Sequence, residues 1–253
     1  MHKVLSVAVA QPLLLSFALA QPIVDKGDVE IKDYKANTSP AEKDQALKLK
    51  GDVKAGQAAY KAYCEACHLP SGRGNPDGSI PQLAGQHPTV LIKQLADIRS
   101  GRRYNPTMYP FARQLADPQA LSNVAAYVAT LCIPLDSGKY KGSDATKQIA
   151  DGKGLYEKDC VRCHQPNGEG VADKLYPVLA GQHYAYLLRQ MTEIRDGKRV
   201  DVPSEMFQAI NKYDSSQLVA ISAYQASLTT PPSMLSPKGS MCRTGADKGR
   251  KAN

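Results

Sequence analysis

The stretch that decides the fold is CEACH, residues 64–68, which places two thiols and an imidazole within five residues. A second cluster of the same form, CVRCH, occupies residues 160–164, displaced by 96 positions along the chain. Two cysteines at this spacing could hold zinc, carry out dithiol redox chemistry or bind a haem covalently. The sequence around the two clusters is the evidence that can distinguish these three chemistries.

The repeat extends well beyond the two clusters. LAGQH stands at residues 83–87 and again at residues 179–183, with the same displacement of 96. RSGRR at residues 99–103 corresponds in the same way to RDGKR at residues 195–199. Single positions that keep this offset are Gly56 and Gly152, Tyr60 and Tyr156, Pro81 and Pro177, and Gln94 and Gln190. Self-similarity over this length indicates the tandem duplication of a domain.

Composition and breaker residues divide the chain into six segments. The first 20 residues have a basic start, an apolar run and the small-residue ending Ala18-Leu19-Ala20, which predicts an export signal. Pro12 interrupts the apolar run, so a permanent membrane helix is not expected there. We expect a signal peptide at residues 1–20, a poorly ordered leader at 21–50, a first domain at 51–131, a linker at 132–146, a second domain at 147–230 and a basic tail at 231–253.

Helical periodicity dominates both domains. Apolar residues fall on one side of a helix that should begin near Pro88 and stop at Gly101, and its twin should span residues 185–196. The last helix of each domain should run from Asp117 to Leu131 and from Asp214 to Leu228, with a capping aspartate at its start. No segment gives a convincing strand pattern, so the sequence predicts an all-α fold.

Covalent haem attachment is the chemistry that explains every member of the two clusters. Zinc usually needs four ligands, and each cluster supplies at most three. A dithiol centre gives no reason for the adjacent histidine. In the haem interpretation, the thiols form thioethers with the two vinyl groups and the histidine binds the iron. The predicted attachment residues are Cys64, Cys67, Cys160 and Cys163, and the predicted proximal ligands are His68 and His164.

Two methionines are candidates for the sixth position on each iron. Met108, in NPTMYPFARQLAD, and Met206, in VPSEMFQAINKYD, occupy equivalent places in the repeat, in loops just before the last helix. They could instead be core methionines, which often fill gaps. The rival ligands are His87 and His183, although a histidine just before a helix more plausibly caps it or forms a hydrogen bond. Filled axial positions leave no place for a substrate, which argues against an enzyme.

Charge and the two remaining cysteines leave further alternatives open. The net charge is +8. The basic tail is either a solvated terminus or a docking segment for an acidic partner or anionic lipid. The export signal disfavours a nucleic-acid role. Cys132 and Cys242 lie outside the repeat and could form a disulfide in an oxidising compartment or stay as free thiols.

The order of CxxCH, glycine-rich loop, LAGQ, Arg-x-Gly-x-Arg and methionine loop, occurring twice, resembles the cytochrome c4 family of dihaem cytochromes. The resemblance covers residues 51–230. It implies two class I cytochrome c domains related by pseudo-two-fold symmetry, each with one covalent haem c. It also implies a periplasmic, often membrane-associated carrier that feeds a terminal oxidase or a similar acceptor. The histidines after LAGQ, the leader, the tail and the two extra cysteines depart from the family pattern.

The sequence therefore predicts a periplasmic dihaem c-type cytochrome that carries single electrons between respiratory redox proteins and has no small-molecule substrate. One alternative is an electron-transfer subunit of a periplasmic dehydrogenase complex. Another is a dihaem enzyme of the peroxidase or thiosulfate-oxidising type. The enzyme alternative predicts that one repeat lacks a usable methionine, and both repeats have one.

Overall fold

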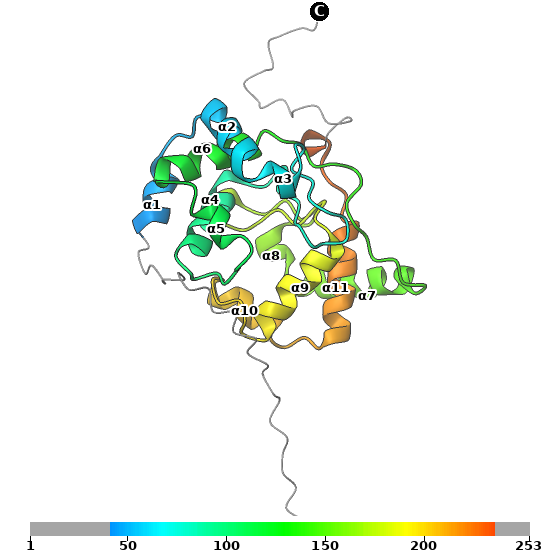
Figure 1. Cartoon of the computed structure of the whole chain (residues 1–253). Helices are drawn as coiled ribbons and strands as arrows, with labels where there is room; N and C mark the ends of the chain where they lie inside the picture. Colours follow the sequence, from blue (N-terminus) through cyan, green and yellow to red (C-terminus); the bar gives the residue numbers. More distant parts are fainter. Residues whose placement is uncertain (1–40, 236–253) are drawn as a thin grey trace, which may run out of the picture. The chain divides into compact units, whose positions relative to one another are not determined.

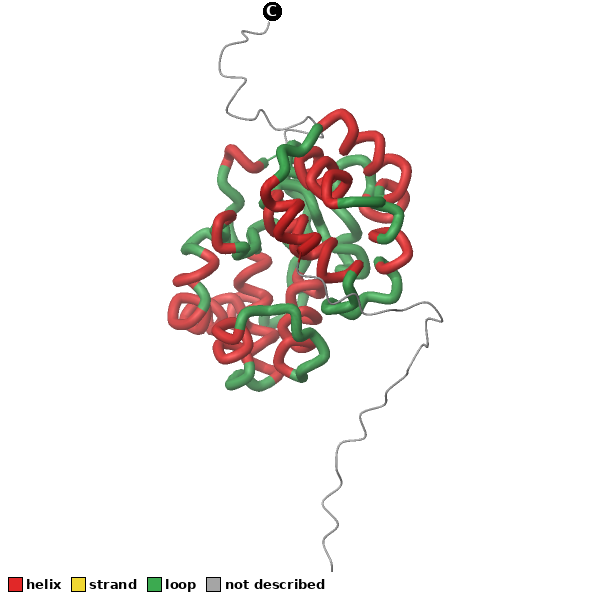
Figure 2. Tube along the Cα trace, turned by 90° about the vertical axis from the view of Figure 1, so that its left-hand side faces the viewer, coloured by secondary structure: helices red, strands yellow, loops and turns green. Residues whose placement is uncertain are grey.

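Residues 41–235 are described by the structure, which is a computed structural model. Helices joined by loops make up this part of the chain, as Figures 1 and 2 show. Within residues 41–235 there is no strand, only two isolated bridges, so the prediction of an all-α fold is confirmed. The α-helices are α1 (Ala41–Lys48), α2 (Val53–Tyr63), α3 (Glu65–His68), α4 (Pro88–Arg99), α5 (Tyr109–Ala112), α6 (Pro118–Val128), α7 (Ala145–Asp159), α8 (Val161–His164), α9 (Tyr184–Arg195), α10 (Ser204–Ile210) and α11 (Ser215–Ser227). Short 3-10 turns are η1 (Ala172–Lys174) and η2 (Pro232–Met234).

Each repeat is built around a close crossing of its first and last long helices. In the first repeat, α2–α6, helix α2 packs against α6, and in the second repeat, α7–α11, helix α7 packs against α11. The two equivalent glycines make these crossings possible. A Cβ atom on Gly56 would lie 1.9 Å from the carbonyl oxygen of Asn123, and one on Gly152 would lie 1.9 Å from that of Ala220. Only a residue without a Cβ atom lets the helix backbones approach so closely.

A tyrosine pair ties each crossing to the loop after the CxxCH cluster. The Tyr60 and Tyr127 rings lie 5.3 Å apart, and the Tyr156 and Tyr224 rings 5.2 Å apart. The Tyr60 hydroxyl donates to the carbonyl oxygen of the residue after His68, and the Tyr156 hydroxyl to that of the residue after His164, both at 2.7 Å. Both acceptor residues have φ of 65°, a left-handed conformation that is uncommon without glycine. The helix crossing therefore fixes the turn that follows each proximal histidine.

The predicted helix starts are confirmed. Pro88 is the first residue of α4, and Asp117 and Asp214 cap α6 and α11. The Asp214 carboxylate accepts from the Gln217 amide, and the Gln217 side chain accepts from the Asp214 amide, which forms a capping box. These signals are local, so the sequence carries them without knowledge of the tertiary fold.

Part of the predicted leader differs from the expectation. Residues 41–48, expected to be poorly ordered, form α1, which packs against α4 and α6. Ala46 is fully buried, and its carbonyl oxygen accepts a hydrogen bond of 2.6 Å from Ser122. Arg99 pairs with Glu42 at 2.8 Å. Tertiary contacts therefore stabilise a helix whose own sequence is mostly polar.

The predicted linker and the start of the predicted tail pack against the two repeats. Ile133, in the linker, is 1% exposed and belongs to the hydrophobic core of the second repeat. It lies against both LAGQ glycines, because a Cβ atom on Gly85 or Gly181 would fall within 2.5 Å of its side chain. The Ile133 amide also donates to the carbonyl oxygen of Met234. The predicted signal peptide and the basic residues of the tail lie outside the described residues. Among helices within residues 41–235, none has the length and apolar character needed to cross a membrane.

Candidate haem sites

The two CxxCH clusters adopt the same local structure. Cys64 ends α2 and also precedes α3, so the other cysteine and the histidine of the cluster lie on one short helical turn. Cys160 has the same position between α7 and α8. His68 is 3% exposed and His164 is 5% exposed. Each cluster therefore presents two thiols beside a buried imidazole.

A backbone carbonyl fixes the tautomer of both proximal histidines. The Nδ1 atom of His68 lies 3.1 Å from the carbonyl oxygen of Pro81, and that of His164 lies 3.1 Å from that of Pro177. A carbonyl oxygen can only accept, so Nδ1 carries the proton and the Nε2 lone pair is left to bind a metal. Burial lowers the pKa of both imidazoles, more than the carbonyl contact raises it, and favours the neutral form that a ligand needs.

The second repeat contains a cavity that fits a haem attached in this way. The cavity measures about 970 Å³ including its open mouth. Cys160, Cys163 and His164 lie on its wall together with Met206. The rest of the lining is largely apolar, as a buried macrocycle requires, and includes Leu175, Met191, Ile194, Val202, Ile210 and Ile221. The residues present therefore fit a covalent haem with one histidine and one methionine available to its iron.

The two candidate methionines differ in their local structure. Met108 is the residue just before α5 and packs beside Ile98, Tyr109 and Ala112. Met206 was expected in a loop, but it lies inside α10. Both side chains are half-buried. A short helix before the last long helix therefore carries or follows the methionine in both repeats.

The thiols and their surroundings fit the competing chemistries less well. Burial is the main cause that raises the pKa of the Cys64 thiol to about 11 and that of the Cys160 thiol to about 12. Dithiol redox centres work with a lowered thiol pKa instead. Among residues 41–235, no group of three or more His, Cys, Asp or Glu side chains could hold a metal ion. The raised thiol pKa values therefore disfavour a dithiol centre, and within residues 41–235 no further His, Cys, Asp or Glu side chains complete a zinc site.

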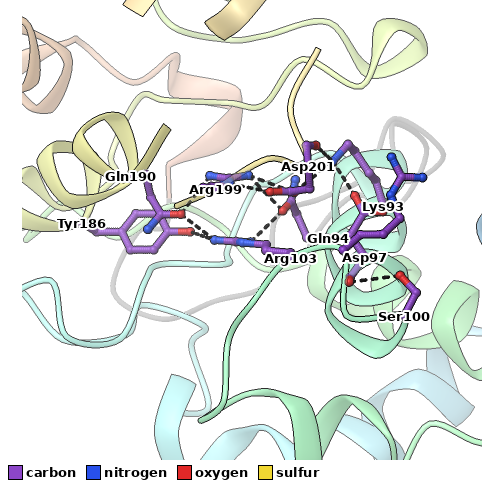
Figure 3. Close-up of polar contacts among 10 residues, drawn as sticks. Lys93, Gln94, Asp97, Ser100, Arg103, Tyr186, Gln190, Arg199 and Asp201 are labelled. Carbon is purple, nitrogen blue, oxygen red and sulfur yellow. Dashed lines mark hydrogen bonds and ion pairs between the residues drawn. The ribbon is translucent and has the colours of Figure 1, made fainter. Parts of the chain in front are cut away.

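A polar cluster joins the two repeats, as Figure 3 shows, and several of its residues line this cavity. Arg103 donates to the side-chain oxygens of Gln94 and Gln190, each at 2.7 Å. Arg199 donates to the same two oxygens, at 2.9 Å to Gln190 and 3.1 Å to Gln94. Sequence reasoning found these residues only as matches in the repeat and gave them no role. The matching itself was the signal, since each repeat supplies one arginine and one glutamine to a shared cluster.

Part of this cluster lines the haem cavity of the second repeat. Lys93 and Gln94, from α4 of the first repeat, line that cavity together with Arg199 of the second repeat. The three donors of Lys93 bind Asp97 and Asp201, so the Gln94 amide and the Arg199 guanidinium are the groups that would donate to the anionic haem propionates. The second haem site is therefore completed by the first repeat.

Asp201 is one of two buried aspartates of the cluster, the other being Asp97. Its side chain has no exposed surface, accepts from Arg199 at 2.9 Å and pairs with Lys93 at 3.2 Å. Burial raises the pKa of this carboxyl group, but the guanidinium of Arg199 and the charges of Lys93 and Arg103 outweigh it and lower the pKa to about 2. The carboxylate therefore stays charged at neutral pH and stabilises the fold there.

Replacing Asp201 with asparagine should lower the free energy of unfolding by about 2 kcal/mol at pH 7, from the pKa difference between the folded and the unfolded chain. The folded pKa is the depressed one, so this contribution is present above about pH 4 and is lost as the pH falls towards 2. Denaturant unfolding of the haem-loaded protein from pH 7 to pH 3 measures it. Asp151→Asn, which breaks the exposed Lys147 pair, should change little at any pH. An Asp201→Asn deficit that stays constant down to pH 3 would contradict the assignment.

His87 and His183, the rival ligands, bind across the two repeats. His87 Nε2 donates to the Glu169 carbonyl oxygen at 2.8 Å, and His183 Nε2 donates to that of Arg73 at 2.7 Å. The remaining ring nitrogen of His183 accepts from the Gly138 amide at 2.9 Å. Both histidines stand at helix N-cap positions without capping through their side chains. The expectation of a hydrogen bond is therefore confirmed, and that of a side-chain cap is not.

Of the two extra cysteines, Cys132 lies within the described residues. Cys132 is 4% exposed and is disulfide-bonded. Cys242 lies outside the described residues. A bond between these two cysteines therefore stays a prediction.

Comparison with known proteins agrees with the geometry of both repeats. The family model described as "Cytochrome c" matches residues 149–229, and the one described as "Cytochrome C oxidase, cbb3-type, subunit III" matches residues 51–128. Cytochrome c4 of Pseudomonas aeruginosa is 35% identical over 184 residues, which are 69% of this chain and 87% of that protein. This chain belongs to the cytochrome c4 family. It contains two cytochrome c domains, carries two covalently bound haem c groups and is a dihaem electron-transfer cytochrome.

Two further relatives of this chain agree with the assignment. The structure of reduced recombinant cytochrome c4 from Pseudomonas stutzeri superimposes with a TM-score of 0.61 at 29% identity, covering 71% of this chain and 100% of that one. The "Thiosulfate dehydrogenase electron acceptor" of Stutzerimonas stutzeri is 34% identical over 172 residues, which are 65% of this chain and 78% of that protein. Both kinds of relative are redox proteins by name.

Proposed function

We propose that this chain carries single electrons between respiratory redox proteins in the bacterial periplasm, towards a terminal oxidase or a similar acceptor. Cys64 and Cys67 attach one haem and Cys160 and Cys163 the other. His68 with Met108 and His164 with Met206 would hold the two irons. The observation that carries this proposal is the cavity that Cys160, Cys163, His164 and Met206 line together, in which the His164 tautomer leaves Nε2 for iron.

The chain's own residues supply positioning and electrostatics for this task. When bound, the haem iron supplies the one-electron chemistry. The proline carbonyls hold each proximal imidazole by its Nδ1 proton, and the apolar lining keeps water from the macrocycle. Lys93 and Arg199, which line the cavity, would offset the charge of the propionates. A histidine and a methionine from each repeat would together leave no position on the iron for a substrate, so the proposal is a carrier and not an enzyme.

The visible absorption spectrum of the oxidised, purified protein tests the axial ligands. We expect the weak far-red band that reports methionine sulfur on ferric haem, with an intensity that corresponds to two haems per chain. Both haems should be low-spin in electron paramagnetic resonance. A band intensity for one haem together with a high-spin signal would overturn the carrier proposal and favour an enzyme with an open site.

One relative favours a second candidate, an electron-accepting partner of a periplasmic dehydrogenase. The relative named "Thiosulfate dehydrogenase electron acceptor" is 34% identical to this chain. Rapid mixing of the oxidised chain with a thiosulfate-oxidising dehydrogenase and thiosulfate tests this candidate. Reduction at a rate that saturates with dehydrogenase concentration would support it, whereas fast oxidation of the reduced chain by a membrane oxidase alone would favour the general carrier.

A further inference from the structure

The glutamine of each LAGQH segment forms hydrogen bonds with the backbone of the opposite repeat. Gln86 donates from Nε2 to the Val178 carbonyl oxygen at 3.0 Å and accepts at Oε1 from the Val178 amide at 2.9 Å. Gln182 accepts from the Gln82 amide at 3.0 Å and donates to the Gln82 carbonyl oxygen at 2.9 Å. Gln82 and Val178 occupy equivalent positions in the repeat. Each glutamine side chain thus donates one hydrogen bond to, and accepts one from, the backbone of a single residue of the opposite repeat.

The residue that each glutamine binds directly follows the proline whose carbonyl oxygen accepts from the proximal histidine. Pro177, which precedes Val178, accepts from His164, and Pro81, which precedes Gln82, accepts from His68. The amide N–H that each glutamine binds belongs to the same peptide unit as the proline carbonyl that accepts the imidazole proton. The connection is crossed, because Gln86 of the first repeat supports His164 in the second and Gln182 supports His68.

The histidines that follow these glutamines strengthen the same crossed contact. His87 binds the Glu169 carbonyl oxygen and His183 that of Arg73, and these acceptors are equivalent positions in the loops that follow CxxCH. Gln182 is 8% exposed and His183 is 1% exposed. Hydrogen bonds removed from water in this way resist exchange with solvent and hold the peptide orientation. Each loop between CxxCH and LAGQH is therefore fixed at two points by the opposite repeat.

We propose that Gln86 and Gln182 are crossed positioning residues, each of which sets the reduction potential of the haem in the opposite repeat. The route is the hydrogen bond from the proximal imidazole Nδ1 to the proline carbonyl. This bond makes the imidazole a more basic ligand and favours ferric iron, so it lowers the potential. Loss of the glutamine loosens the carbonyl, weakens the bond and raises the potential of that haem. The inference rests on His68 and His164 as iron ligands, as in the proposed function.

The test replaces each glutamine with leucine in the haem-loaded protein. Gln86→Leu should shift the reduction equilibrium of the haem on His164 about tenfold towards the reduced form, equivalent to about 59 mV for one electron. It should leave the haem on His68 within about twofold, and Gln182→Leu should give the reverse pattern. Redox titration followed by the paramagnetic proton resonances of each haem measures both potentials. Met108→His assigns the signals, because it lowers the potential of the haem in the first repeat.

Thr89→Val is the matched control for Gln86→Leu. Thr89 also donates from the first repeat to a backbone oxygen of the second, that of Ala172 at 2.7 Å, but away from the proline carbonyl. It should move neither potential, so a shift there equal to that of Gln86→Leu would overturn the proposal. A shift confined to the haem of the mutated repeat, or equal in both haems, would also overturn it.

Two further measurements separate failure of this inference from failure of haem uptake or of the proposed function. If either leucine variant fails to take up haem, Gln86→Asn and Gln182→Asn, which keep the amide but shorten it, should show the same crossed pattern at smaller size. The far-red band of the unmodified protein reports the methionine ligands independently. Its absence would defeat the proposed function, whereas its presence with uncrossed shifts would defeat only this inference.

Discussion

Replacing Met206 with histidine should lower the reduction potential of the haem in the second repeat by more than about 100 mV, since axial ligands set haem potentials over roughly 0.8 V. The thioether of methionine is a soft ligand that favours ferrous iron, and an imidazole removes that preference. Met206 lies on the same cavity as His164, which places it within the site that the iron would occupy. Redox titration with visible detection measures the shift, and the far-red band should fall to half its intensity.

The cavity supplies a matched control for this substitution. Met191 lies on α9, is 5% exposed and lines the same cavity, but it belongs to the apolar core of the second repeat. Met191→Leu conserves apolar volume and should leave the far-red band at full intensity. If Met191→Leu halves the band while Met206→His leaves it intact, the distal ligand has been assigned to the wrong methionine.

Much of the fold could be predicted because its signals are local. The paired clusters, the proline before α4 and the aspartates before α6 and α11 act within a few residues of their own position. The duplication gave the domain organisation, since matching residues must have matching surroundings. These features need no information about which distant segments meet.

Most of the features that could not be predicted depend on distant partners. Helix α1 is held by burial of Ala46 and by Ser122, 76 residues away. The LAGQH glutamines contact residues 92 and 100 positions away in the opposite repeat, so in the sequence they read only as the end of a loop. The arginine and glutamine cluster likewise forms only when the two repeats meet. Periodicity and composition carry no record of such contacts.

The repeated arrangement has a consequence for electron transfer. Lys93 and Gln94 of the first repeat line the cavity of the second, and the reciprocal glutamine contacts connect each proximal loop to the other repeat. A change in one repeat therefore reaches the haem environment of the other through hydrogen bonds and charge. Each haem environment therefore depends on residues of both repeats, which two separate single-haem proteins would not provide.

Replacing Gly152 with alanine should lower the free energy of unfolding by about 3 kcal/mol, the upper part of the range for overpacking a core. The added Cβ atom would lie 1.9 Å from the Ala220 carbonyl oxygen and 3.0 Å from the Tyr224 Cβ atom, so α7 and α11 would have to separate. Tyr156 and Cys160 stand on the same end of α7, and the displacement would loosen the turn that holds His164. Thermal unfolding of the haem-loaded protein measures the loss.

Gly154→Ala, two residues further along α7, separates this packing effect from helix propensity. Nothing lies within 4 Å of a Cβ atom at Gly154, so alanine there should stabilise the protein by about 0.5–1 kcal/mol. Opposite signs at two glycines of one helix can arise only from the close crossing with α11. Equal effects at both positions would mean that the crossing can widen freely, and the tyrosine pair would then not be what fixes the loop after the second CxxCH cluster.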